Sequence, residues 1–358
     1  MDTHSNKYTI IKGIADDTEL ESYRQCFEKN GTERDIKNLQ WLHQQNLTGT
    51  HTIYYAMEGE QVAAIYTAMP VVLKINNTKV NALQSIDTIT DVAHRGKGLF
   101  PKLANKLYDD AAKNNYELVY GFPNENSAPG FFKKLQWISF GEAPFLLKPL
   151  SLKYLIDKVL KKKPTSGLVN EHHAYELPAT FDIDKNSMIQ ALDTFGEEYD
   201  QLWAKVSADI AVAVDRSAAY MNWRYLDKPG EVYSKCGIFI DGKLKGIVVF
   251  TIKNKHNGRI GYLMELIFDS SLQTNPGVTL LKFATRIFKQ EKTDAVLAWS
   301  FSHSFNYKSF TRSGYFNLPI KLRPQHLFLG VRAFNETNRN LIEGIKNWYI
   351  SYSDSDTV

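Results

Sequence analysis

The sequence predicts an α/β fold built of two similar domains. Its 358 residues suit two domains, each with a core of its own, better than one. Residues 80 to 122 read as a strand, a glycine-rich loop, a helix and a second strand. Pieces of this half recur about 180 residues later, a spacing that indicates a duplicated domain and not a solenoid.

The helix after the glycine-rich loop is predicted from the spacing of its apolar residues. Leu99, Leu103 and Leu107 recur at helical spacing, with Phe100, Ala104 and Ala111 beside them. Pro101 suits a first helical turn. A strand over 116–122 follows, and a further helix is expected to start at Ser127.

The earlier elements follow from the same patterns. We expect helices over 17–28 and within 31–50, and strands over 8–12, 51–57, 62–75 and 80–92. Alternation along 80–92 predicts that Ser85, Asp87 and Asp91 share one face of the last strand. These three are candidate catalytic residues serving an acceptor amine. The alternative is that the two acids cap a turn or pair with a lysine.

The loop Arg95-Gly96-Lys97-Gly98-Leu99 has the character of an anion site. Two glycines and two cations lead directly into a helix start, where backbone N–H groups gather. No Ser or Thr follows the lysine, and G-x-G-x-x-G is absent, so neither a Walker A loop nor a dinucleotide fingerprint is present. A turn that merely needs two glycines remains the alternative.

The stretch from Thr90 to Trp137 resembles the coenzyme A motif of the GNAT acyltransferases. It carries V-x-x-x-x-R-G-x-G before an amphipathic helix, then a strand, Asn-x-x-Ser and a closing K-L-x-aromatic. The resemblance implies tandem GNAT-like domains, each a mixed, mostly antiparallel sheet flanked by helices. It also implies that the cofactor is held by Thr90, Asp91, Val92, Arg95, Gly96, Lys97, Gly98, Leu99, Phe100, Asn124, Ser127 and Phe132.

Two positions depart from that pattern. Phe100 stands where the family usually has a small residue beside the pyrophosphate, and Phe132 stands where it often has a Tyr that protonates the departing thiolate. The resemblance therefore leaves the source of that proton open.

The second half lacks the basic loop. Asn275-Pro276-Gly277 takes its place, whereas Glu265 and Asp269 fall in the phase of Asp87 and Asp91. We therefore expect domains at 1–150, binding coenzyme A and catalytic, and at 176–358, degenerate and contributing to the acceptor site, with a basic linker helix and loop at 151–175.

Candidate substrate-binding residues also lie in the second half. Ser302, His303 and Ser304 occupy a strand-to-helix junction, the usual place of function in an open α/β sheet. His303 is a candidate acid or base, or else bonds a backbone carbonyl or caps the next helix. Tyr220 and Trp223 either stack on a substrate ring or pack in the core. The aromatic tail should be ordered, with Asp354 and Asp356 near a surface or a site.

Composition limits the remaining function classes. The net charge of +4 is small, with only Lys161-Lys162-Lys163 clustered, so no nucleic-acid partner is expected. Cys26 and Cys236 have no metal or redox spacing, which fits a reducing cytoplasm and no metal. No apolar run approaches the roughly 18 residues that span a bilayer, so no membrane partner is expected either.

The resemblance implies a CoA-dependent N-acyltransferase that moves an acetyl or short acyl group from acyl-CoA to a small-molecule primary amine. The tandem arrangement is similar to members of bacterial surface-polysaccharide pathways, whose acceptors include nucleotide-linked amino sugars. Other hypotheses are an acetyltransferase of polyamines, aminoglycosides or peptides, a peptidoglycan-bridge transferase using aminoacyl-tRNA, and a non-catalytic acyl-CoA-binding module.

Overall fold

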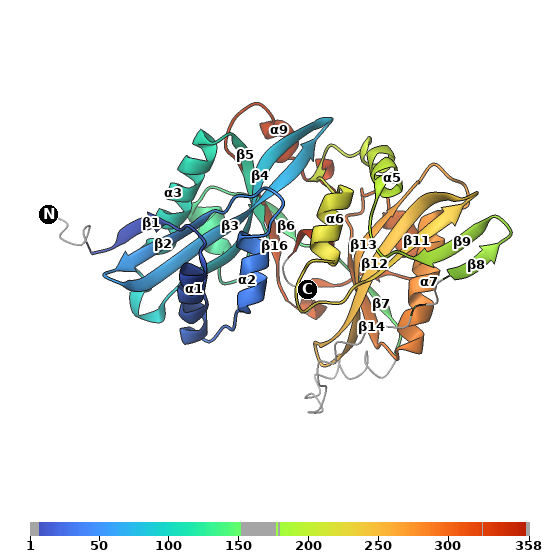
Figure 1. The fold of residues 1–358 in the computed structure, drawn as a ribbon, viewed down its shortest axis with the longest axis horizontal. Helices are drawn as coiled ribbons and strands as arrows, with labels where there is room; N and C mark the ends of the chain where they lie inside the picture. The colour runs from blue at the N-terminus through green and yellow to red at the C-terminus, as the bar shows by residue number, and fades with distance from the viewer. Residues whose placement is uncertain (1–6, 152–176, 178–179, 324, 356–358) are drawn as a thin grey trace. The chain divides into compact units, whose positions relative to one another are not determined.

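A computed structural model describes residues 7–151, 177, 180–323 and 325–355 (Figure 1). The chain divides into two compact units. The first unit comprises Met1–Glu142, Asp227–Gly230 and Leu327–Asn347. The second unit comprises Ala143–Leu226, Glu231–His326 and Trp348–Val358.

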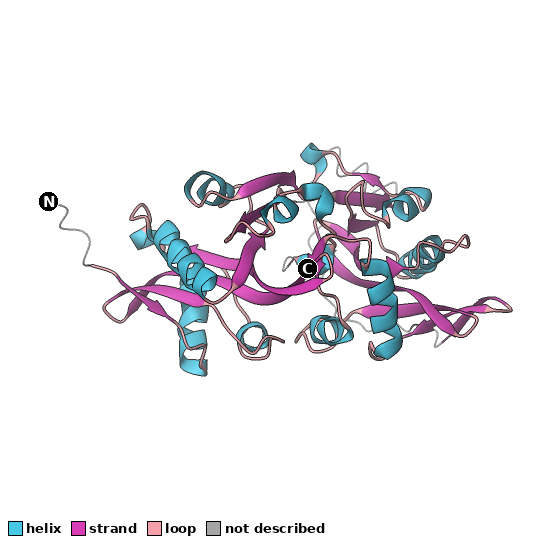
Figure 2. Ribbon diagram, turned by 90° about the horizontal axis from the view of Figure 1, so that it is seen from above, coloured by secondary structure: helices cyan, strands magenta, loops and turns pink. Residues whose placement is uncertain are grey.

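The first unit holds a mixed sheet with helices on both faces (Figure 2). Its strand order is β1-β2-β3-β4-β5-β16-β6, antiparallel except for the parallel pair β4 and β5. The elements are β1 (Thr9–Lys12), α1 (Asp17–Lys29), α2 (Ile36–His43), β2 (Ile53–Glu58), β3 (Gln61–Ile75), β4 (Thr78–Thr90), η1 (Val92–His94), α3 (Leu99–Lys113), β5 (Tyr116–Gly121), η2 (Gly130–Lys134), β6 (Ile138–Glu142), β16 (Phe328–Ala333), α9 (Arg339–Ile342) and η4 (Ile345–Asn347).

The second unit repeats this plan. Its sheet runs β15-β7-β14-β13-β12-β11-β9-β8, again with one parallel pair, β13 and β14, joined through a helix. The elements are β7 (Phe145–Pro149), β8 (Thr180–Asp184), β9 (Ser187–Ala191), α5 (Glu197–Ser207), β10 (Val212–Val214), α6 (Ala218–Tyr225), β11 (Ser234–Ile240), β12 (Lys243–Lys255), β13 (Gly258–Phe268), α7 (Pro276–Gln290), β14 (Ala295–Trp299), α8 (Tyr307–Arg312), β15 (Phe316–Asn317), η3 (Ile320–Leu322) and η5 (Tyr352–Asp354). The predicted tandem GNAT-like architecture is thus confirmed.

Each sheet includes a strand from the opposite half of the sequence. β16 lies beside β5 in the first unit, and β7 lies beside β14 in the second. The compact units are therefore discontinuous, unlike the continuous domains expected from the sequence. The first unit stops at Glu142, short of the expected residue 150, and regains residues 327–347.

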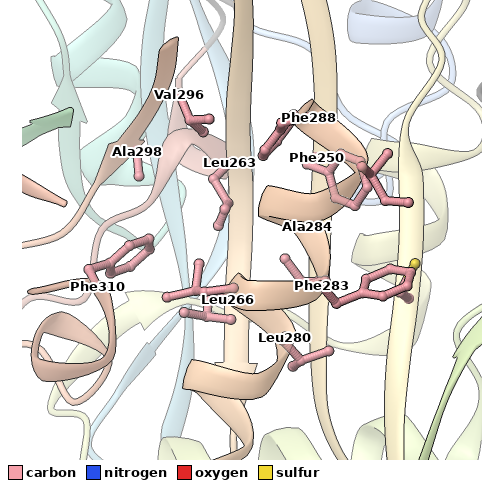
Figure 3. Close-up of a cluster of buried hydrophobic side chains, with 14 of the residues drawn as sticks. Phe250, Leu263, Leu266, Leu280, Phe283, Ala284, Phe288, Val296, Ala298 and Phe310 are labelled. Carbon is pink, nitrogen blue, oxygen red and sulfur yellow. The ribbon is translucent and has the colours of Figure 1, made fainter. Parts of the chain in front are cut away.

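Helices α3 and α7 close corresponding cores. The predicted stripe of α3, including Leu99, Leu103 and Leu107, is buried against β2, β3 and β5. In the second unit, Leu280, Phe283, Ala284 and Phe288 of α7 point toward the strands that carry Phe250, Leu263 and Leu266 (Figure 3). The burial of these apolar faces fixes each helix start at the end of a long strand.

The alternation predicted for 80–92 is wrong at one point. Tyr66 pairs with Thr88 but Ala68 pairs with Ser85, so β4 carries one extra residue in a bulge. The bulge reverses the alternation. Ser85 contacts Tyr66 on the α3 face, whereas Asp87 contacts Tyr23 of α1 on the opposite face. The expected common face of Ser85 and Asp87 does not exist.

Three further expectations have different outcomes. The helix expected from Ser127 is a short π-helical turn, Gly130–Lys134. The linker helix and loop of 151–175, including Lys161 to Lys163, and the tail residue Asp356 lie outside the described residues, apart from Ser151. Asp354 is fully buried and ion-paired with Arg216, so the expectation of a surface position is wrong.

Candidate active site

The loop between β4 and α3 depends on two glycines in the left-handed region. Gly96 has φ +77° and Gly98 has φ +70°, a conformation that costs L side chains free energy. A Cβ placed on either glycine would meet no heavy atom within 4 Å. Arg95 and Lys97, beside them, are exposed. The loop therefore presents two cations and open space around its backbone.

The first turn of α3 has unsatisfied amides. Gly98 is the N-cap and offers no side-chain cap, and Lys102 is the first residue whose N–H bonds back, to the Gly98 carbonyl at 3.3 Å. Pro101 has no N–H, so Leu99 and Phe100 carry the free amides of this turn. Free N–H groups and the positive end of the helix dipole favour an anion here.

His94 fixes the start of the loop. Nδ1 of this buried side chain lies 3.1 Å from the Tyr8 hydroxyl oxygen and 3.3 Å from the Glu58 carboxylate. Val92 is exposed, and its N–H donates to Asn30 Oδ1 at 3.0 Å. Strands β1 and β2 and the end of α1 thereby hold the approach to Arg95.

The end of β4 has an open edge. Pairing with β5 stops at Ser85 and Gly121, yet β4 continues to Thr90. The Asp91 N–H donates to Ala63 on β3, so by antiparallel alternation the backbone groups of Thr88 and Thr90 point away from β3. Among these groups, the Thr90 carbonyl accepts from Arg95 Nε at 3.4 Å.

Phe100 and Phe132 fill space beside this edge. A Cβ on Gly130 would lie 2.6 Å from the Phe100 ring, and one on Gly330 would lie 2.6 Å from the Phe132 ring. Both rings therefore pack against glycine backbone. The Phe100 ring also packs edge-on against Phe131, with centroids 5.0 Å apart.

Asn124 and Ser127 shape the turn after β5. The Asn124 side-chain oxygen accepts from the backbone N–H of Asn126 at 3.0 Å and of Ser127 at 3.1 Å, and the Ser127 hydroxyl bonds back to Asn124. These two predicted cofactor residues thus form an Asx turn. Their role in the described structure is to start the turn that carries Phe131 and Phe132.

Asp91 is held by α1. Its carboxylate forms an ion pair with Lys29 at 2.6 Å and accepts from the Ala93 N–H at 2.9 Å. The hydrogen bond from Lys29, aided by the Ala93 amide, lowers the pKa of Asp91. Asp91 and Lys29 line a pocket of about 290 Å³ together with Glu19, Cys26 and Tyr55. The alternative in which Asp91 pairs with a lysine is the observed one.

Asp87 is held by a tyrosine and an arginine. It accepts from the Tyr23 hydroxyl at 2.7 Å and from Arg34 through Nε at 3.0 Å and Nη2 at 2.6 Å. Burial, with the nearby Asp87 charge, raises the pKa of Tyr23. Beside Tyr23, burial lowers the pKa of His43 to about 4, so that imidazole is neutral. Asp87 is therefore an anchored anion on the α1 face.

In the second unit, the corresponding helix start is closed. The side chain of Asn275 caps α7 by accepting from the Val278 N–H at 3.1 Å, and Pro276 removes an amide. A Cβ on Gly277 would lie 2.4 Å from the Phe268 ring, so no space remains there. The open edge is closed too. Asn306 donates to the carbonyl of Leu266, which corresponds to Thr88, at 3.1 Å.

The paired acids repeat between the units. Asp269 forms an ion pair with Lys205 of α5 at 2.6 Å, as Asp91 does with Lys29 of α1. Glu265 corresponds to Asp87 and is fully buried, accepting from Arg216 at 2.7 Å and from the hydroxyls of Tyr349 and Ser351. Glu265 is thus a buried carboxylate with several hydrogen-bond partners, and its role in substrate binding stays a prediction.

The other predicted substrate residues are split between surface and core. Ser302 and His303 are exposed at the β14–α8 junction, where His303 Nε2 lies 3.1 Å from the Trp348 carbonyl and its ring stacks on Phe301. Ser304 is partly buried beside them. Tyr220 and Trp223 are 6% and 4% exposed. Their rings pack in the core, which is the alternative given for these two residues, and substrate stacking stays a prediction.

Sequence analysis missed the partners of both acids. Tyr23, Lys29 and Arg34 lie more than 50 residues before Asp87 and Asp91, too far for any local pattern to connect them. One signal was present. Lys29 and Lys205 recur at nearly the interval that separates Asp91 from Asp269, so the repeat itself contained the pairing.

The described residues contain neither a candidate metal cluster nor a candidate membrane-spanning helix. No cluster of three or more His, Cys, Asp or Glu side chains within the described ranges could hold a metal ion. Among the same residues, no helix is both long and apolar enough to cross a bilayer.

Part of the first unit matches a known protein family. Residues 17–139 match the acetyltransferase (GNAT) domain family. This stretch carries α1, the open β4 edge and the Arg95 loop. No curated protein sequence matches the chain.

Solved structures share the fold over both units. A GCN5-related N-acetyltransferase from Anabaena variabilis is 12% identical, with a TM-score of 0.61 over 91% of this chain and 73% of that one. A probable N-acyltransferase from Enterococcus faecalis is 12% identical, with a TM-score of 0.57 over 91% and 72%. N-myristoyltransferase from Saccharomyces cerevisiae with bound myristoyl-CoA is 14% identical, with a TM-score of 0.57 over 91% and 82%.

The residues of the first unit fit the diphosphate of coenzyme A. The free amides of Leu99 and Phe100, the exposed cations Arg95 and Lys97 and the open space at Gly98 together provide donors, charge and room. At the α7 start in the second unit, the Asn275 cap and Pro276 leave fewer free amides, and the Phe268 ring fills the space at Gly277.

Proposed function

We propose that the protein is a CoA-dependent N-acyltransferase whose first unit binds acyl-CoA and transfers an acetyl or short acyl group to a primary amine. One contrast supports this proposal above all. The uncapped α3 start and open β4 edge of the first unit correspond to a capped helix and a filled edge in the second. A duplicated domain would keep one pair of surfaces open only if a ligand used it.

The chain would hold the cofactor in two places. Arg95, Lys97 and the amides of Leu99 and Phe100 would bind the diphosphate, and the Thr88 and Thr90 backbone would bond the amides of the pantetheine arm. Bound acyl-CoA supplies the thioester whose acyl group is transferred. Backbone N–H groups along the open edge of β4 would stabilise the developing oxyanion.

Asp91 and Asp87 would attract the acceptor more than deprotonate it. An alkylamine has a pKa of roughly 10, so it arrives as an ammonium and must lose a proton before attack. Lys29 lowers the pKa of Asp91, which therefore stays ionised and is a weak base. We assign the proton transfer to water ordered by these carboxylates. His303 remains an alternative base.

The acceptor is proposed to be a small-molecule amine, with a nucleotide-linked amino sugar as the first candidate. Support comes from the sequence likeness of Arg95–Phe100 and Gly121–Ser127 to acyltransferases of that group. A melting assay with thymidine and uridine diphosphates tests the idea, since a nucleotide-linked acceptor should raise the melting temperature. Absence of any shift would favour polyamines, aminoglycosides or peptides. Both cysteines are free and buried, which suits a cytoplasmic site of action.

Thiol release from acetyl-CoA across a panel of amines tests the activity. We expect Arg95→Ala to weaken CoA binding about tenfold or more, because one charge-assisted bond to phosphate is lost. Lys113→Ala, an exposed cation at the far end of α3, is the matched control and should bind normally. Equal binding by the two variants would refute the assigned diphosphate site.

A non-catalytic acyl-CoA-binding module is the second candidate. Phe132 packs where a tyrosine would be expected, and both carboxylates near the edge are already paired. Such a module would bind CoA in calorimetry yet release no thiol with any amine.

A further inference from the structure

Ser85 marks the point at which β4 and β5 separate. Ser85 and Gly121 form the last pair, and a Cβ on Gly121 would lie 3.0 Å from the Ser85 carbonyl oxygen. The two strands therefore approach closely at this pair, and a side chain at Gly121 would be tightly packed against Ser85. Ser85 is partly exposed, so its hydroxyl borders the inner end of the open edge.

A chain of buried hydrogen bonds on the α3 face ends at this hydroxyl. Trp137 Nε1 donates to the Tyr108 hydroxyl at 3.1 Å. Tyr108 and Tyr66 share a hydrogen bond of 2.7 Å, and the Tyr66 hydroxyl donates to Ser85 Oγ at 3.1 Å. Both tyrosine side chains and the tryptophan are at most 3% exposed.

The direction of this chain is set by Trp137. Its indole N–H can only donate, so the Tyr108 oxygen accepts and the Tyr108 proton must go to Tyr66. Tyr66 in turn donates to Ser85. In the reverse direction the Tyr108 proton would be buried without an acceptor, which is costly. The Ser85 proton is consequently directed away from the core, toward the open edge.

The length of the open edge matches the pantetheine arm. About twelve bonds separate its phosphate oxygen from its sulfur, roughly the span of four extended residues. Thr90, beside the Arg95 loop, and Ser85 are separated by a comparable stretch of β4. An arm that follows this edge from the diphosphate loop would end at Ser85.

Building on the proposed function, we propose that Ser85 is a catalytic residue whose hydroxyl hydrogen-bonds the sulfur of the departing thiolate, and that Tyr66 positions it. In the transfer, the amine nitrogen forms the bond to the acyl carbon while the carbon–sulfur bond breaks. The electron pair remains on sulfur, where the Ser85 O–H stabilises it. The proton lost by the amine goes to solvent, and solvent later protonates the thiolate to give the thiol.

No proton needs to leave the buried chain. Burial raises the pKa of Tyr66 to about 12, so Tyr66 keeps its proton and acts as a fixed donor to Ser85. The role that a tyrosine on the last helix would have, absent here because of Phe132, thus falls to a serine on β4. Polarised hydrogen-bond chains strengthen their terminal donor, which suits this position.

The direct test is the pKa of the thiol of bound coenzyme A, followed by the ultraviolet absorbance of the thiolate during a pH titration. Binding to the wild-type protein should lower the thiol pKa below its free value. Ser85→Ala and Tyr66→Phe should each raise it again by about one unit, a tenfold change in acid dissociation. Tyr54→Phe is the matched control. Tyr54 lies on the same face but bonds Asp110, so its loss should leave the thiol pKa unchanged.

The outcomes separate this inference from the proposed function. A Ser85→Ala protein that binds CoA with the wild-type thiol pKa would overturn the assignment of Ser85. The expected pKa pattern without thiol release for any amine would support Ser85 as the sulfur partner and overturn catalysis. A wild-type protein that ignores CoA would overturn both. In active protein, Ser85→Ala should lower kcat about tenfold with little change in KM.

Discussion

Replacing Gly98 by asparagine should give the α3 start the closed form found at α7. Asn275, the N-cap of α7, adopts a left-handed conformation and caps with its side chain, so asparagine is compatible with the φ of +70° at Gly98. An N-cap side chain accepts from the N–H of the second or third helical residue. In α3 the third residue is Pro101, which has no N–H, so the new side chain would accept from the Phe100 N–H.

The two free-energy terms can be compared. Exchanging glycine for asparagine at an N-cap changes stability by only a few tenths of a kcal/mol. A Cβ added at Gly98 would meet no protein heavy atom within 4 Å, so the side chain has room to extend from the loop. Binding is affected more, because a cap removes one amide from the phosphate, and a hydrogen bond to a charged group is worth about 1.5–3 kcal/mol. We expect CoA to bind 10- to 100-fold more weakly at unchanged melting temperature.

Calorimetric titration with coenzyme A, paired with thermal melts, measures both quantities. Gly141→Asn is the control, because Gly141 lies in the same unit with φ +82° and similarly open surroundings, away from the loop. It should bind CoA as the wild type does. If Gly98→Asn also bound CoA normally while remaining folded, the amides of this turn would not be the diphosphate site.

Three further predictions concern the paired acids and the filled edge. Lys29 lowers the pKa of Asp91, so this carboxylate contributes stability above about pH 4 that is lost as the pH falls through its folded value. Lys29→Met should shift that loss to higher pH in acid unfolding curves; because Lys29 is 57% exposed, the effect should stay below about 1 kcal/mol, and an unchanged curve would refute the pairing. Arg216→Ala leaves Glu265 and Asp354 buried without their cation and should cost about 3–5 kcal/mol in urea unfolding; a loss under 1 kcal/mol would contradict the buried network. Asn306→Ala removes the donor to the Leu266 carbonyl and should lower the free energy of unfolding in urea by about 1–3 kcal/mol. Unchanged stability would mean that water replaces the amide.

Local patterns were sufficient for the elements that carry the loop. Helical spacing of Leu99, Leu103 and Leu107 predicted α3 at the observed start, directly after the loop that contains Gly96 and Gly98. These features depend on residues close in sequence, where propensity and burial agree. The repeat likewise predicted that Asp269 corresponds to Asp91, and both are paired with a lysine of the preceding helix.

The face of β4 could not be predicted by alternation. A bulge adds one residue between Ser85 and Thr88, and no residue type in that stretch marks it. One slipped residue exchanges the two faces. Ser85 therefore joined the tyrosine network of the α3 face instead of the acids, and this change underlies its proposed role.

The strand exchange was equally hidden. The pairing of β7 with β14 and of β16 with β5 is decided by contacts more than 140 residues away, which no local pattern reveals. Tyr220 and Trp223 illustrate the same limit. Two aromatic residues on a short helix give the same sequence pattern whether they bind a ligand or pack in a core. Here they pack against the C-terminal segment, which only the structure shows.

We propose that only the first unit binds acyl-CoA, through the start of α3 and the free edge of β4. Hydrogen exchange with and without coenzyme A, resolved by peptide, tests it most directly. Coenzyme A should slow hydrogen exchange in peptides covering Thr88 to Phe100 and should leave exchange unchanged in peptides covering Leu266 to Val278. Protection of the second set, or of neither, would contradict it.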